Sequence, residues 1–181
     1  MSDIEIVNIA GLGDLQREVN IEVLAADMPL PVSNYDPKFN ASFFRFEEDG
    51  ELVILYTSGK YILRGGDEFE TMYAVNERFL GLLEEMGVEV DAAGLEIKNV
   101  VAVGNLGHDL DLNALTIDLG FEDVEYEPEQ FPGLVYRPDG TNCVLLVFGS
   151  GKVVITGGRT QKEDEKAFAA LEEHIKQSAL G

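Results

Sequence analysis

The chain has 181 residues, of which 45% are hydrophobic, so a packed core is expected and wholesale disorder is excluded. Acidic residues outnumber basic ones 34 to 13, and the net charge is −21. No apolar run approaches the roughly 18 residues of a membrane span and no secretory signal is visible, so we expect a cytoplasmic protein.

The first half of the chain predicts a strand, a helix, a turn region and three further strands before a long helix. Residues 4–10 are strand-like, and Leu15, Val19 and Val23 recur at helical spacing. A turn region then ends in Tyr35-Asp36-Pro37. The remaining predicted elements are strands at 41–46, 51–57 and 60–64 and a helix at 68–86 that ends at Gly87.

The second half repeats this pattern at a spacing of about ninety residues, which grows by one between Tyr35 and Phe39. Glu5–Ile9 recurs as Glu96–Val100, and Ser58-Gly59-Lys60 recurs as Ser150-Gly151-Lys152. Two copies are too few for a solenoid. We therefore predict two repeats, 1–91 and 92–181, that form one pseudo-twofold domain. The corresponding elements are strands at 95–101, 133–137, 143–149 and 152–156, a helix on Leu106, Leu110 and Ala114, and a helix at 162–177.

The element order β-α-β-β-β-β-α, found twice, predicts an α+β fold in which helices cover one face of an antiparallel sheet. The strands around 52–56 and 144–148 are apolar on both faces, so the uncovered face should expose an apolar patch. Such patches usually mark binding surfaces, and burial by dimerisation is the alternative. Basic residues outnumber acidic ones in the blocks 38–64 and 137–159, which predicts a cationic rim for this face.

The acidic charge by itself argues against nucleic acid as a partner, because DNA is also a polyanion. A cytoplasm at molar salt is a different explanation, since surface charges are then screened over about 3 Å. We favour this adaptation to high salt over the alternative of a merely acidic, solvated surface.

The segments Tyr126–Arg137 (YEPEQFPGLVYR) and Leu145–Gly157 (LLVFGSGKVVITG) resemble the TATA-box-binding protein family, in its acidic, halophilic archaeal form, and the resemblance extends over nearly the whole chain. It implies a pseudo-twofold saddle, with a ten-stranded curved antiparallel sheet and helices on its convex face. The implied function is that of a general transcription initiation factor, associated with the nucleoid, that binds and bends TATA-like promoter DNA through the minor groove. Transcription factor B and RNA polymerase are the implied protein partners, and no cofactor is implied.

The resemblance also implies contact residues. Two aromatic pairs, Phe131 with Phe148 and Phe39 with Tyr56, are expected to wedge between base steps. Asn8 and Asn99 are expected to donate to minor-groove acceptors at A·T pairs. The other expected DNA contacts are Arg45, Ile54, Lys60, Ile62, Arg64, Val101, Arg137, Leu146, Lys152, Val154 and Thr156. The expected docking site for transcription factor B consists of Tyr126, Glu127, Glu129 and Gln130.

The first repeat departs from the family pattern at three contact positions. Tyr56 stands where the family has Phe, Asn40 follows Phe39 where a small apolar residue is usual, and Arg64 stands where Thr156 stands in the second repeat. Arg64 either reads a narrow minor groove or reaches a phosphate, and both interpretations remain open. These changes support an alternative function: a paralogue with the same fold that acts as a protein-interaction or regulatory module, with weak or altered DNA binding.

An enzyme is disfavoured. His108 and His174 lie at unrelated positions of the two repeats, and no cluster has metal-ligand spacing. Cys143 is the only cysteine, so no internal disulfide is possible, and its apolar surroundings predict a core residue rather than a nucleophile. The acidic runs Glu47–Asp49 and Glu163–Glu165 are expected to be solvated charges at a turn and at a helix start.

The net charge has a consequence for binding. At molar salt the release of counterions contributes little to DNA affinity, whereas apolar burial is not weakened by salt. We therefore expect the DNA affinity to stay flat or rise with salt.

Overall fold

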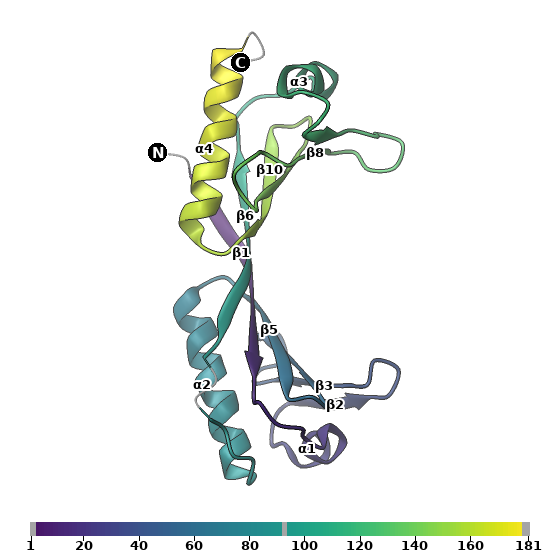
Figure 1. The fold of residues 1–181 in the computed structure, drawn as a ribbon, viewed down its shortest axis with the longest axis vertical. Helices are drawn as coiled ribbons and strands as arrows, with labels where there is room; N and C mark the ends of the chain where they lie inside the picture. The colour runs from purple at the N-terminus through teal and green to yellow at the C-terminus, as the bar shows by residue number, and fades with distance from the viewer. Residues whose placement is uncertain (1–2, 92–93, 179–181) are drawn as a thin grey trace. The chain divides into compact units, whose positions relative to one another are not determined.

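The computed structural model describes residues 3–91 and 94–178 (Figure 1). The first repeat contains β1 (Ile4–Asp14), α1 (Ile21–Asp27), β2 (Val32–Asp36), β3 (Ala41–Arg45), β4 (Leu52–Tyr56), β5 (Lys60–Gly66) and α2 (Phe69–Glu85). The second contains β6 (Glu96–Asn105), α3 (Leu112–Leu119), β7 (Val124–Glu125), β8 (Leu134–Tyr136), β9 (Val144–Val147), β10 (Lys152–Gly158) and α4 (Gln161–Gln177). The α+β class and the order β-α-β-β-β-β-α are confirmed, and the second strand of each repeat, β2 or β7, lies in the segment that the sequence indicated only as a turn region.

The strands form one ten-stranded sheet in the order β2-β3-β4-β5-β1-β6-β10-β9-β8-β7. The described contacts divide the chain into two units. We call residues 8–98 the N-unit and residues 3–7 with 99–178 the C-unit. The contacts therefore place the first residues of β1 with the second repeat. The predicted repeat boundary between 91 and 92 adjoins residues 92–93, which lie outside the described residues.

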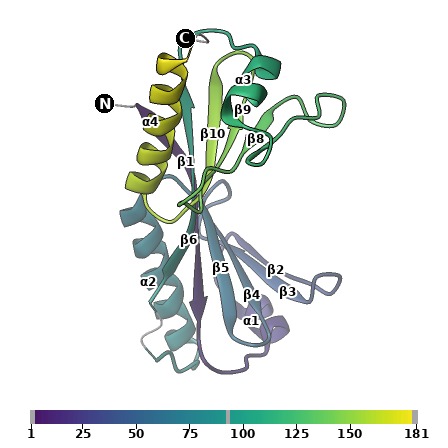
Figure 2. The same cartoon turned by 45° about the horizontal axis from the view of Figure 1, so that its top comes forward.

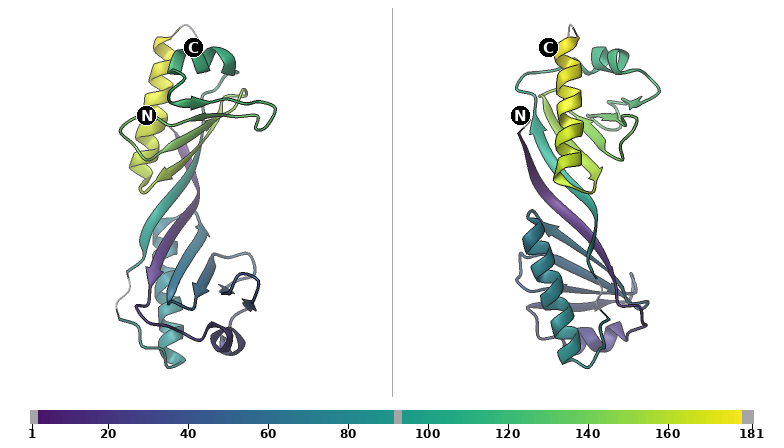
Figure 3. Two further views of the ribbon diagram at one scale, coloured as in Figure 1. Left: turned by 45° about the vertical axis from the view of Figure 1, so that its right-hand side comes forward. Right: turned by 60° about the vertical axis from the view of Figure 1, so that its left-hand side comes forward.

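In the N-unit, α2 covers one face of the strands (Figures 1 and 3). The Phe79 ring of α2 lies 5.8 Å from Phe44 and 5.2 Å from Tyr61, and all three side chains are buried. The Tyr61 hydroxyl donates a 2.5 Å hydrogen bond to Asn76 Oδ1, which satisfies two polar groups in this core. Gly13 of β1 faces the Tyr61 ring so closely that a Cβ would not fit.

In the C-unit, α4 covers the corresponding face (Figures 2 and 3). Phe168, Leu171 and Ile175 of α4 are each about 1% exposed, as expected for the apolar stripe of an amphipathic helix. Gly104 of β6 has no Cβ that would collide with the Phe168 ring, just as Gly13 has none that would collide with Tyr61. In both units a glycine therefore leaves room for one large ring. Cys143 is buried in this core, as predicted.

The short helices begin later than predicted. Leu15 and Val19 were expected inside a helix, but their backbone N–H groups donate to Gly59 O and Thr57 O at 2.9 and 3.0 Å. These bonds keep the chain non-helical until Asn20, whose side chain caps α1. In the second repeat, Leu106 and Leu110 likewise bond to the β9–β10 turn, and α3 begins at Leu112 after the Asp111 cap. The spacing of apolar residues here reflects side chains anchored in the core, not a helix.

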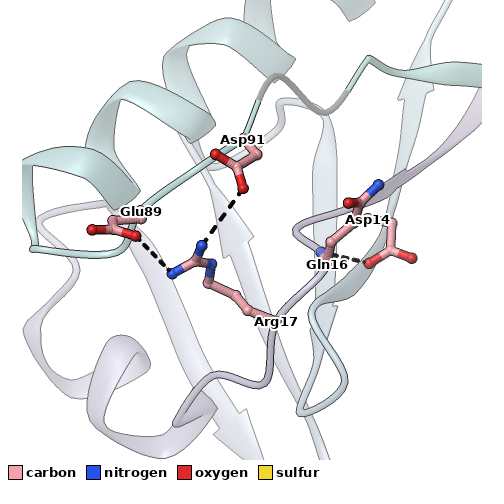
Figure 4. Close-up of polar contacts among 5 residues, drawn as sticks. All are labelled: Asp14, Gln16, Arg17, Glu89 and Asp91. Carbon is pink, nitrogen blue, oxygen red and sulfur yellow. Dashed lines mark hydrogen bonds and ion pairs between the residues drawn. The ribbon is translucent and has the colours of Figure 1, made fainter.

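The loop after β1 is held by an ion-pair cluster (Figure 4). The Arg17 guanidinium lies 3.4 Å from Glu89 Oε2 and 3.8 Å from Asp91 Oδ2, so it ties this loop to the segment after α2. The neighbouring Gln16 has φ of 56°, and its N–H donates to Asp14 Oδ1. Gly107 occupies the same place in the second repeat with φ of 85°, so both repeats turn left-handed here.

Candidate nucleic-acid interface

The second repeat has an apolar row on the sheet face that α4 does not cover. Val154 pairs with Val103 on one side and with Leu146 on the other, and Leu146 pairs with Val135. All four are half-buried, whereas the alternate residues Val153, Ile155 and Leu145 are fully buried. We call the uncovered face of each unit its open face. This arrangement agrees with the expectation from the apolar strands.

The first repeat has the same row with different side chains. Ile62 pairs with Leu12 and with Ile54, and Ile54 pairs with Phe43. Phe43 occupies the position of Val135, and it packs with Tyr56 and Ile62 on the buried cluster around Ile54. Ile54 is therefore only 8% exposed, although it was predicted as a DNA contact, while its counterpart Leu146 is half-buried. The larger Phe43 presents its own surface in this part of the open face.

The expected aromatic pair of the second repeat is present. The centroids of the Phe131 and Phe148 rings lie 5.8 Å apart at an interplanar angle of 69°, an edge-to-face contact. Both rings lean over Gly133, where a Cβ would lie 2.8 Å from Phe131 and 3.1 Å from Phe148. The Phe131 side chain is 38% exposed, so it is held in place and still accessible.

The aromatic pair of the first repeat is arranged differently. Phe39 contacts Phe43 edge-to-face at 6.3 Å, and no ring contact with Tyr56 occurs among the described residues. Phe39 is 61% exposed, and the Lys38 ammonium lies 5.6 Å from its centroid. Asn40 turns the chain directly after it with φ of 49°. Phe43, which the sequence reasoning missed, is thus the aromatic neighbour of Phe39.

Asn99 lies on the open face beside a β-bulge in β10. Its Oδ1 accepts hydrogen bonds from Gly157 N at 2.7 Å and from Thr156 Oγ1 at 3.2 Å. The register shifts between Ile155 and Gly158, and Gly157 has φ of 89°, so the bulge depends on glycine. The Asn99 Nδ2 group forms no hydrogen bond with any described residue, so its two N–H donors are available to a ligand.

Asn8 lies beside the equivalent bulge of β5, where the register with β1 shifts after Ile9 and Gly65 has φ of 108°. No hydrogen bond of the Asn8 side chain occurs within the described part of the chain. Arg64 replaces the threonine here, between Ala10 and Leu52 on the neighbouring strands. Its side chain is exposed and has no ion pair with another described residue.

The other predicted cations differ in how they are held. Arg45 donates to Gly50 O within its hairpin, and Arg137 lies 3.7 Å from Glu125. Lys60 and Lys152 are exposed and form no ion pair with any described residue. The lysines can therefore reach an anionic ligand without breaking an ion pair within the described residues. Arg137 would have to give up its contact with the Glu125 carboxylate to do so.

The loop predicted to bind transcription factor B also positions Phe131, which was predicted to wedge between base steps. The backbone N–H groups of Gln130 and Phe131 both donate to Glu127 O, at 2.9 and 3.0 Å. This turn leaves Glu127, Glu129 and Gln130 exposed, with Tyr126 half-buried against the core. The same turn therefore exposes the Glu127 and Glu129 carboxylates and fixes the backbone position from which the Phe131 side chain extends.

One acidic residue contradicts the expectation of solvated charges. Asp164, in the first turns of α4, is 0% exposed, and its Oδ1 accepts from the Cys143 thiol at 3.6 Å. Its Oδ2 is buried and has no hydrogen-bond partner among the residues that the structure describes. Burial raises the pKa of Asp164 to about 7, while the thiol contact lowers it and Glu163 raises it. Desolvation also raises the pKa of the Cys143 thiol. The acidic pattern of a helix start concealed this burial.

The described residues give no sign of a metal centre or a membrane span. No group of three or more His, Cys, Asp and Glu side chains among them is arranged to hold a metal ion. None of the helices in residues 3–91 and 94–178 has the length and apolar character needed to cross a bilayer.

Comparisons with known proteins agree on one family. Residues 3–86 and 94–178 match the family model described as "Transcription factor TFIID (or TATA-binding protein, TBP)". The chain is 45% identical to TATA-box-binding protein C of Halobacterium salinarum over 96% of its own length and 98% of that protein's. It is 40% identical to TATA-box-binding protein 2 of Haloferax volcanii, covering 98% of this chain and 95% of that one. The solved structure of Methanococcus jannaschii TBP superposes with a TM-score of 0.82 and 33% identity, over 97% of this chain and 99% of that chain.

Proposed function

Because the chain belongs to the TATA-binding protein family, we propose that it is a general transcription factor that binds and bends TATA-like promoter DNA through its open sheet face. The family consists of transcription factors rather than enzymes. The arrangement of Asn99, with its carbonyl tied to the protein and its amide donors free, is the observation that best supports the proposal. The minor groove of A·T pairs offers only acceptors, and Asn99 offers donors.

The aromatic pair supports bending. A side chain that enters a base step must be apolar, accessible and fixed, because unstacking costs a few kcal/mol per step and a mobile wedge would add an entropic cost. Phe131 and Phe148 meet these conditions through their mutual contact and the glycine beneath them. In the first repeat we propose Phe39, braced by Phe43 rather than by Tyr56, as the corresponding wedge.

The bending experiment uses a TATA-like duplex with fluorophores at its ends. Energy transfer should rise when the protein binds, and Phe148→Ala should abolish most of that rise and weaken binding roughly tenfold or more, since one stacked base contributes about 1–3 kcal/mol. Phe121→Ala is the matched control, because Phe121 is 73% exposed and lies in the α3–β7 loop rather than in a strand of the sheet. If Phe148→Ala bent DNA as well as the unaltered protein, the wedge assignment would be wrong.

We propose further that the exposed carboxylates of the Glu127–Gln130 turn bind transcription factor B, which then recruits RNA polymerase. Glu127→Lys with Glu129→Lys should leave the complex with DNA intact and prevent the ternary complex in a mobility-shift experiment. Glu122→Lys with Glu84→Lys, an equal charge change at two other exposed positions, should leave both complexes intact. Loss of the binary complex instead would show that the turn acts through Phe131.

The alternative is an interaction module with the same fold that does not act on promoters. The covered Ile54 and the Arg64 replacement in the first repeat favour it. Absence of any shifted complex with TATA-like duplexes between low and molar salt would support this alternative. In the free protein, dimerisation through the open face remains a further proposal. Sedimentation with and without the duplex tests it, because DNA should then convert dimers into monomeric complexes.

A further inference from the structure

The residue that packs from the long helix onto the glycine at the bulge differs between the two repeats. In the first repeat, the buried Met72 of α2 packs on Gly66, whose Cβ would lie 2.6 Å from Met72 Sδ. In the second repeat, Asp164 of α4 occupies this position and its carboxylate packs on Gly158, again leaving no room for a Cβ. The fold therefore does not require a carboxyl group at this position, because an apolar side chain serves there in the first repeat.

The Asp164 carboxyl is connected to the open face by a short series of contacts. It packs on Gly158, the adjacent Gly157 donates its N–H to Asn99 Oδ1 at 2.7 Å, and Asn99 presents its amide on the open face. The first repeat has the methionine and has no hydrogen bond of Asn8 to its bulge among the described residues. The carboxyl and the Asn–bulge hydrogen bond thus occur together in one repeat.

We propose that Asp164 is a positioning residue for Asn99. While the buried carboxyl of Asp164 is protonated, it holds the Gly157–Gly158 bulge in the form that binds DNA. This inference rests on the proposed function of the open face. A neutral carboxyl fits a site where Oδ1 meets a thiol and Oδ2 meets no donor. Once the proton is lost, an anion with one unpartnered oxygen is strongly disfavoured in this site, and the carboxyl must move towards water.

The direction of the pH effect follows from the surroundings of the group. Cys143, directly before β9, and Glu163 from the same helix are the titratable groups that act on Asp164. Burial raises the pKa of Asp164 from 3.8 to about 7, so the folded protein holds this proton more tightly than the unfolded chain does. Its contribution to stability is complete below the unfolded value and is lost as the pH rises through about 7. Weaker DNA binding is therefore expected on the alkaline side.

The first experiment measures the free protein by NMR at constant potassium chloride. The Gly157 amide should titrate with a midpoint near pH 7 in the unaltered protein, and Asp164→Asn should remove that titration. Glu165→Gln, which neutralises an acid that only bonds Gln161 at 3.0 Å, should leave it unchanged. A Gly157 amide that does not titrate, or that titrates equally in Asp164→Asn, would overturn the proposal whether or not the protein binds DNA.

The second experiment measures the affinity for a TATA-like duplex between pH 6 and 8.5. The unaltered protein should lose on the order of tenfold over this range, because one proton is linked to binding. Asp164→Met, which carries the residue type of the first repeat, should fold and give a flat profile, and Glu165→Gln should keep the slope. A flat profile in the unaltered protein, or an equal slope in Asp164→Met, contradicts the proposal. Absence of binding at every pH would instead refute the proposed function, and the Gly157 titration would still decide the role of Asp164.

Discussion

The backbone N–H of Gly157 donates a 2.7 Å hydrogen bond to Oδ1 of Asn99, and this contact determines which end of the amide is left for a ligand. Asn99→Asp keeps the acceptor that the bulge needs and removes both free donors. It should therefore fold normally but bind a TATA-like duplex roughly tenfold or more weakly, because each lost hydrogen bond to a groove acceptor costs about 1 kcal/mol and the new charge is repelled. Asn113→Asp on the exposed side of α3 is the matched control in a titration by fluorescence anisotropy.

The two bulge glycines differ in the room around them. Gly65 and Gly157 both have positive φ, so alanine costs roughly 1–2 kcal/mol at either position. A Cβ at Gly65 would lie 3.6 Å from its nearest neighbour, Glu51 Cα, whereas at Gly157 it would collide with Asn142 O. Gly157→Ala should therefore lower the free energy of unfolding about 1–3 kcal/mol more than Gly65→Ala does. Chemical denaturation of both variants at one salt concentration measures the difference, and equal losses would contradict it.

Tyr61 should be the last of the tyrosines to ionise. Burial raises its pKa to about 12, although the hydrogen bond with Asn76 lowers it. A raised folded pKa means that the stabilisation is complete below the unfolded value of 10.0 and is lost as the pH rises through about 12. Burial also raises the pKa of Tyr136, so absorbance titration should show more than one late phenol, and Tyr61→Phe should remove the last of them. That variant should also lose about 1–3 kcal/mol, because Asn76 is left unpaired, whereas the control Tyr73→Phe, 45% exposed, should lose almost nothing.

Salt should not weaken promoter binding at molar concentration. The net charge is −21, while the open face presents apolar rows in both units. Affinity measured between about 0.5 and 2 M potassium chloride should stay flat or rise, since counterion release contributes little there and apolar burial is retained. Lys152→Gln should weaken binding only at the low end of the range. A steep fall of the unaltered protein with salt would contradict this expectation.

The sequence predicted the elements best where side-chain pattern and backbone agree. The alternating strand residues around Ile62 and Val154, and the long helices that end at Glu85 and Gln177, lie close to where they were expected. The pattern misled where apolar residues are core anchors in an irregular segment, as at Leu15 and Leu110. Their spacing matches a helix, but the hydrogen bonds that hold them come from a hairpin turn distant in sequence. Propensity and periodicity do not report such bonds.

Some contacts of the candidate interface were likewise predictable from the sequence, and others were not. Phe131 and Phe148 are recognisable from their motif and do meet in space. The contact of Phe39 with Phe43, and the packing of Phe43 on the cluster that contains Ile54, depend on which strands pair and in what register. Pairing in register is a long-range property, because a shift by one residue would turn every side chain of the strand to the other face.

The sequence by itself determined the duplication, the α+β class and the family, because these depend on residue types recurring at fixed spacing along the chain. Only the tertiary structure decided that Asn99 offers donors rather than an acceptor, and that Asp164 is buried in an apolar core instead of solvated at a helix start. The availability of a hydrogen-bonding group and the pKa of a carboxyl are set by neighbours that packing brings together. Those neighbours, Gly157 for one and Cys143 with Gly158 for the other, are far from them in the chain or on another element.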